Sequence, residues 1–121
     1  MFLGLAAAGC GGSGTLTASQ LEKETEAIDS VAAEGALLAA DVERDRTTEP
    51  FARIHSGALS EQAESAVEAL HKPAAHGLED ERRREAARAR RVTTALDQLH
   101  SSPTDPDVAA RVRRQLERLA E

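Results

Sequence analysis

The sequence predicts an all-α fold, a small up-down bundle of about four helices. Large aliphatic residues recur at intervals of three and four positions in four successive segments. Pro50, Pro73 and Pro103 separate these segments, and no stretch shows the strict apolar–polar alternation of a strand. Short connections favour antiparallel neighbours, and an elongated helical hairpin that completes its core in a dimer is the alternative arrangement.

The first helix is expected to begin at Thr17. Thr17 and Gln20 fit a capping box, in which each side chain accepts a hydrogen bond from the backbone N–H of the other residue. Leu16 and Leu21 are spaced for the hydrophobic staple that accompanies such a cap. The large apolar residues that recur at helical spacing in this segment are Leu21, Ile28, Val31, Leu38 and Val42.

Gly35 lies inside this first helix, where a glycine is about 1 kcal/mol less favourable than an alanine. We expect a compensating contact, in which the backbone of a neighbouring helix approaches closely at this position. Ala32 and Ala39 fall on the same face and would extend this seam of small residues.

The second helix is expected to begin after Thr47 or Thr48 and to end before Pro73. Pro50 then lies in its first turn, where the missing N–H does little harm. The apolar face that we assign to this helix consists of Phe51, Ile54, Ala58, Leu59, Ala66, Val67 and Leu70.

The third helix is expected from about Ala75 or Leu78 to Leu99. Its apolar residues are Leu78, Ala89, Val92, Leu96 and Leu99. After a turn that contains Pro103, Asp105 is placed to cap a fourth helix with Pro106 in the first position. The apolar residues of the fourth helix are Val108, Val112, Leu116 and Leu119.

The composition fits one small domain of 121 residues with 40% hydrophobic and 30% charged residues. The two phenylalanines are its only aromatic residues, so the core must be built from Leu, Val, Ile and Ala. No apolar run reaches the roughly 20 residues of a membrane-spanning helix. The formal net charge of −6 argues against general nucleic-acid binding, which depends on Lys and Arg neutralising phosphates.

The single cysteine, Cys10, excludes an intramolecular disulfide. It follows a short apolar stretch that ends in Ala8 and Gly9, and it precedes a Gly/Ser run at residues 11–14. This segment resembles the lipobox of bacterial lipoproteins, although Ala7 stands at the position where that family favours Leu. The resemblance implies cleavage before Cys10, a diacylglycerol on its thiol and a flexible tether behind it.

The resemblance covers about a tenth of the chain and divides it into three parts. Residues 1–9 are expected to be a signal peptide that continues upstream, because no Lys or Arg precedes Cys10. Residues 10–16 are expected to be the lipidated cysteine and its tether, and residues 17–121 the helical domain. The alternative is a cytosolic protein in which Cys10 has no special role.

The densest charged segment spans residues 79–91. On a helix, Arg84, Arg88 and Arg91 share one face and are candidates for contact with anionic lipid headgroups or an acidic envelope polymer.

Internal ion pairing is the alternative for this segment. Glu79 and Arg83 are four residues apart, as are Asp80 and Arg84, in the order that stabilises a helix. Arg88 and the arginines after it have no such partner, and the acidic first helix could supply one.

Neither an enzyme nor a metal site is expected. His71 and His76 flank the turn at Pro73, but their spacing matches no standard zinc motif. The serines stand in no nucleophile elbow, and the only glycine-rich segment does not follow a strand. We therefore expect no catalytic residue, no metal ligand and no cofactor.

These observations together predict a bacterial protein held on the outer face of the cell membrane by lipid on Cys10. Its helical domain would have an interaction or structural role, with a protein partner or a second copy of the chain. Two alternatives stay open, namely a cytosolic helical protein that assembles through its Ala/Leu stripes and an extracytoplasmic binder of a ligand or metal.

Overall fold

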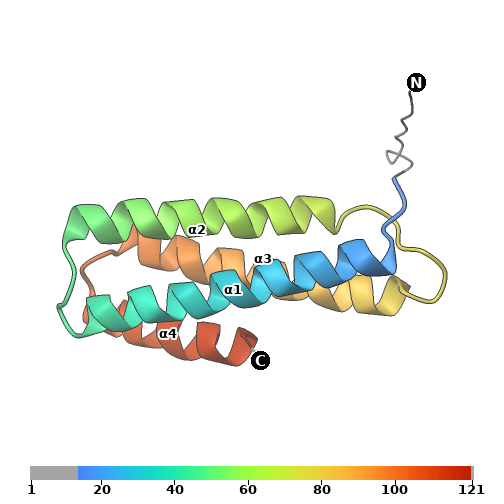
Figure 1. Ribbon diagram of the computed structural model, residues 1–121. Coiled ribbons are helices and arrows are strands. Elements are labelled where there is room, and N and C mark those ends of the chain that lie inside the picture. Colours follow the sequence, from blue (N-terminus) through green and yellow to red (C-terminus); the bar gives the residue numbers. More distant parts are fainter. Residues whose placement is uncertain (1–13, 121) are drawn as a thin grey trace, which may run out of the picture.

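The computed structural model describes residues 14–120, and within them the chain forms four α helices joined by short turns (Figure 1). The helices are α1 (Ala18–Glu43), α2 (Glu49–Ala69), α3 (Glu79–Ser101) and α4 (Pro106–Leu119). The predicted all-α bundle is therefore confirmed, with helix breaks close to the three prolines that predicted them.

The helices run alternately up and down around one core (Figure 1). α1 and α3 each pack against both α2 and α4, and they also touch each other across the centre. α2 and α4 are the one pair of described helices that make no contact. The bundle thus closes within a single chain, which an elongated hairpin would not do.

Two of the predicted N-terminal caps are present as full hydrogen-bonded motifs. The backbone N–H of Gln20 donates to Thr17 Oγ1 at 3.1 Å, and the backbone N–H of Thr17 donates to Gln20 Oε1 at 2.9 Å. Asp105 accepts hydrogen bonds from the first turn of α4, whose first residue is Pro106. Each cap satisfies backbone donors that have no partner inside the helix, and so fixes where the helix begins.

The core is built from leucines and small residues. Its largest completely enclosed side chains include Leu59 from α2, Leu96 and Leu99 from α3 and Leu116 from α4. Alanines fill much of the remaining interior and allow the helices to approach closely. The buried alanines are Ala32, Ala36, Ala39, Ala52, Ala63, Ala66, Ala86, Ala89, Ala95 and Ala109.

Gly35 is buried in α1 and faces both α3 and α4. A Cβ atom at this position would lie 2.8 Å from Leu96 Cδ2 and 2.9 Å from Leu116 Cδ1, which is too close for an unshifted contact. The expected close approach is confirmed, with buried Ala32 and Ala39 beside it. Leucine side chains, rather than the backbone of a neighbouring helix, make that approach.

The apolar face assigned to α2 from the sequence is partly wrong. Phe51 and Ile54 are 53% and 73% exposed, and Ala58 is exposed as well. The face that packs on the core is rotated toward small residues, which lie closer to the neighbouring helices. It consists of Ala52, Ser56, Leu59, Ala63, Ala66 and Leu70.

Leu16 belongs to the bundle and not to the tether that we expected over residues 10–16. It is buried, its N–H donates to the carbonyl oxygen of Pro73 at 2.8 Å, and its own carbonyl accepts from the N–H of Ala75 at 2.9 Å. This short parallel bridge joins the chain before α1 to the α2–α3 loop at one end of the bundle (Figure 1).

Candidate anionic-surface interface

Arg88, which the sequence placed in an exposed stripe, is an internal residue. Its side chain is only 14% exposed, and its Nη1 donates to Asp29 Oδ1 of α1 and to the carbonyl oxygen of Leu119, each at 2.6 Å. Its Nη2 donates to Glu85 Oε1 at 2.7 Å. The acidic first helix does supply a partner, and Arg88 is removed from the candidate contact surface.

Burial acts to lower the pKa of Arg88, but its hydrogen bonds with Glu85 and Asp29 outweigh that effect and raise the pKa. The guanidinium is therefore a fixed positive charge that links α1, α3 and the end of α4. A planar group with several donors suits this multiple contact, which a lysine could not reproduce.

The ion pairs at the start of α3 differ from those predicted. Glu79 pairs with Arg82 and Asp80 pairs with Arg83, three residues apart instead of four. Arg82 also donates from Nη1 to the carbonyl oxygen of Leu70 at 2.7 Å, which ties the start of α3 to the end of α2. This second contact explains why Glu79 selects Arg82 over the more exposed Arg83.

Arg84 and Arg91 are exposed, and Arg90 beside them is exposed too. α4 carries three further exposed arginines, Arg111, Arg114 and Arg118, spaced so that they share its outward side. Within residues 14–120, none of these six side chains takes part in an ion pair. We call this set the arginine face; it consists of Arg84, Arg90, Arg91, Arg111, Arg114 and Arg118.

The arginine face spans the neighbouring helices α3 and α4. One shallow depression at their seam is lined by Arg90 and Arg91 with Gln115 of α4, and the next is lined by Arg111 together with Asp97. Thr94 contributes to both depressions, so the two adjoin. The residues predicted from the sequence include Arg84 and Arg91 of this surface but not Arg90 or the arginines of α4, because the packing of two helices side by side brings the two sets together.

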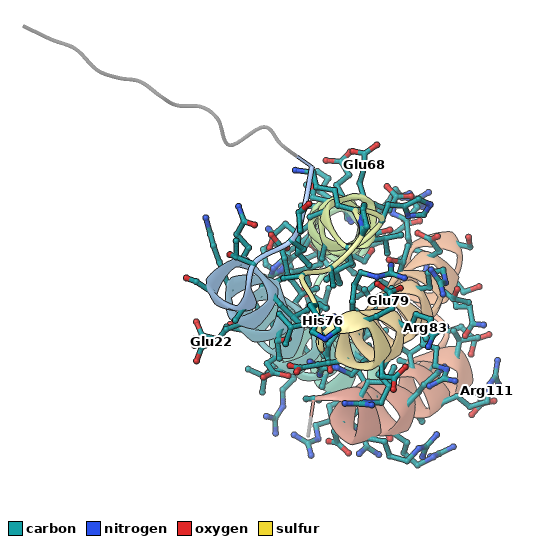
Figure 2. All side chains as sticks on the ribbon, turned by 90° about the vertical axis from the view of Figure 1, so that its right-hand side faces the viewer. Glu22, Glu68, His76, Glu79, Arg83 and Arg111 are labelled. Atoms are coloured by element: carbon teal, nitrogen blue, oxygen red, sulfur yellow. The ribbon has the colours of Figure 1, made fainter. Side chains whose placement is uncertain are left out.

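Charge is divided between the two halves of the bundle. α1 and α2 together carry eleven carboxylates against Lys23 and Arg53, whereas α3 and α4 together carry seven carboxylates against ten arginines. Viewed along the bundle axis, Glu22 and Glu68 point outward from α1 and α2, and Arg111 projects on the far side from Glu22 (Figure 2). The net charge of −6 therefore conceals a basic side.

A groove of about 760 Å³ runs along the seam of α2 and α3. Glu61, Glu64 and Glu68 line it from α2, and Arg90 lines it from α3. The groove is open to solvent and is lined by side chains of both charges.

Three of the four histidines lie at a loop or join two helices. His71 and His76 lie in and around the α2–α3 loop and are exposed. Nδ1 of His100 donates to the carbonyl oxygen of Arg53 at 2.9 Å and thereby joins α3 to α2. In the part of the chain that the structure describes, no group of three or more His, Cys, Asp or Glu residues is arranged to hold a metal ion.

Three large apolar side chains on α1 and α2 are exposed. Leu37 of α1 is 69% exposed, and on α2 Phe51 and Ile54 are more than half exposed. His55 stacks edge-on against Phe51 with ring centroids 5.2 Å apart and lies 3.4 Å from Glu34 of α1. These two contacts place the Phe51 ring beside the seam of α1 and α2.

Cys10 lies outside the described residues. None of the helices within residues 14–120 combines the length and apolar character needed to cross a membrane. No protein family, no curated protein and no solved structure matches the chain.

Proposed function

We propose that the chain is an exported bacterial lipoprotein, anchored by lipid on Cys10 to the outer face of the cell membrane. Its helical bundle has a non-catalytic role, as an interaction or structural module of the cell envelope. The observation that carries the proposal is the spacing between the lipobox-like segment and Leu16, the first buried residue in the part of the chain that the structure describes. Only residues 11–15 separate Cys10 from buried Leu16.

That spacing suits a tethered domain. Residues 11–15 span at most about 18 Å, so a lipid on Cys10 would hold the bundle close to the anchoring surface. The hydrogen bonds of Leu16 with Pro73 and Ala75 hold the chain before α1 against one end of the bundle, and a tether that precedes Leu16 would join the bundle there.

A non-catalytic role is supported by the surroundings of the serines. Ser56 is completely buried and donates to the carbonyl oxygen of Ala52 at 2.7 Å. Ser60 donates to Asp97 at 2.6 Å across α2 and α3. The Ser56 hydroxyl is bonded to its own helix and the Ser60 hydroxyl joins α2 to α3, so both are used in structural hydrogen bonds.

Detergent phase partitioning tests the anchor. The gene, expressed with the genomic sequence upstream of Met1, should yield a protein that enters the detergent phase, while the Cys10→Ala form stays in the aqueous phase. If both forms stay in the aqueous phase, the proposal fails and the cytosolic alternative holds. The Cys10→Ala form also serves as the folding control, because Cys10 precedes the first core residue.

A further inference from the structure

We propose that the arginine face is the side of the bundle that lies against anionic lipid headgroups, so that α3 and α4 rest along the membrane surface. This inference rests on the proposed lipid anchor, and it specifies how the anchored bundle is oriented. A surface of fixed positive charge is attracted to anionic lipids, so it would orient a bundle that the anchor already holds near the membrane.

The arginine face has the properties that contact with a charged surface requires. Its six guanidinium groups are exposed and, within the described residues, are not neutralised by ion pairs, whereas Arg82, Arg88 and Arg113 are committed to partners inside the bundle. The depressions between them are shallow and do not enclose a ligand. An extended plane of anionic headgroups fits this spread of charges better than a small acidic molecule, which would need donors that converge.

Orientations that bring another side of the bundle to the membrane are electrostatically unfavourable. The α1 and α2 side carries most of the carboxylates and would be repelled by an anionic surface. The end where Leu16 joins the bundle presents Glu22, Glu68 and Glu79 beside Arg83 (Figure 2). Exposed Lys72 belongs to the α2–α3 loop at the same end. A bundle that stood upright on that end would therefore bring a mixed, partly acidic surface to the lipid.

The tether allows the bundle to lie flat. Six peptide steps separate Cys10 from Leu16 and reach at most about 22 Å, roughly twice the diameter of a helix with its side chains. The bundle can therefore turn from its end onto its α3 and α4 side without moving out of range of the anchor.

Binding to lipid vesicles tests this orientation. The probe protein is the full chain with Cys10→Ser, so the result does not depend on lipid attachment. It should sediment with phosphatidylglycerol vesicles at low salt, should be released at 1 M salt, and should not sediment with phosphatidylcholine vesicles. Arg111→Ala with Arg114→Ala should weaken binding about tenfold or more, because two charges leave the contact.

The matched control is Lys23→Ala with Lys72→Ala, which also removes two positive charges, but from the end of the bundle where Leu16 lies. This control should bind almost as well as the parent chain, and circular dichroism should show that both double variants are folded. Equal weakening of both variants, or weakening of the lysine variant alone, would overturn the proposed orientation. Binding to soluble polyglutamate without binding to vesicles would assign the face to an acidic polymer and overturn the lipid contact.

Failure of the anchor and failure of this inference are distinguishable. Loss of detergent partitioning with intact vesicle binding would refute only the lipid attachment at Cys10, and not the lipid contact of the arginine face. Detergent partitioning without vesicle binding would refute the arginine face as a lipid contact and leave the anchor in place.

Discussion

Arg88 of α3 donates a hydrogen bond of 2.6 Å to Asp29 of α1, which lies 59 positions earlier in the chain. The same guanidinium caps α4 by donating to the carbonyl oxygen of Leu119. One residue thus connects three of the four helices at the point where α4 ends. Arg88 is therefore a structural residue inside the bundle, whereas the arginines of the arginine face are exposed.

Replacement of Arg88 should therefore destabilise the bundle. Arg88→Ala leaves Asp29 and Glu85 without their shared donor, and we expect a loss of roughly 1–3 kcal/mol in the free energy of unfolding. Urea denaturation followed by circular dichroism measures this change. Arg84→Ala is the matched control on the same helix and should change the free energy by less than about 0.5 kcal/mol. Equal effects of the two substitutions would contradict the internal role of Arg88.

Overpacking at Gly35 is the second prediction. Gly35→Leu should lower the free energy of unfolding by roughly 1–3 kcal/mol, because its side chain must displace Leu96 and Leu116. This loss should occur although leucine is the better helix former. Ala33→Leu, at an exposed position of the same helix, should leave the melting temperature nearly unchanged. A higher melting temperature for Gly35→Leu would show that the seam is not closely packed.

The orientation of α2 gives a third prediction. Ile54→Gln should alter the free energy of unfolding by less than about 0.5 kcal/mol, because the Ile54 side chain faces solvent. Leu59→Ala should cost about 2–5 kcal/mol, because Leu59 is completely enclosed. Thermal melts of the two variants compare these positions directly. A large loss for Ile54→Gln would restore the apolar face that the sequence predicted.

The pH dependence of stability involves Glu79. Its hydrogen bond from Arg82, together with one from the backbone N–H of Ala74, lowers the pKa of Glu79 from its usual value of 4.5. The unfolded chain then binds a proton more readily, so this carboxylate contributes stability above about pH 4.5 that is lost as the pH falls through its lower folded-state pKa.

Glu79→Gln should consequently destabilise the protein at pH 7 and should differ less from the parent chain near pH 3. Chemical denaturation at the two pH values measures both differences. Glu61→Gln is the control, since Glu61 is exposed and takes part in no ion pair within the described residues. An effect of Glu79→Gln that is the same at both pH values would mean that the hydrogen bonds, and not the charge, matter.

The sequence alone predicts the features that depend on contacts between residues close together in the chain. The caps at Thr17 and Asp105 follow from side chains that bond backbone donors within three positions, and both are present. Gly35 was correctly predicted to mark a close contact, because a glycine inside a helix needs compensation. Its actual partners, Leu96 and Leu116, could not be predicted, since they come from two other helices.

The remaining differences arise where tertiary packing decides. Periodicity favoured the large side chains Phe51 and Ile54 as the core face of α2, but the bundle buries its small residues there so that the helices can approach closely. Helical geometry placed Arg88 beside Arg84 and Arg91 correctly. It does not predict that Arg88 turns inward to bind Asp29 and the end of α4. Nor does it predict that the arginines of α4 lie on the same side as exposed Arg84 and Arg91.

The central claim is that Cys10 becomes the lipidated N-terminus of the mature protein. Lys23 is the first Lys or Arg in the sequence, so trypsin should release residues 10–23 as a single N-terminal peptide. Mass spectrometry of membrane-extracted protein should find this peptide starting at Cys10 and carrying a diacylglycerol. A tryptic peptide that contains the residues before Cys10 and an unmodified thiol would contradict the account.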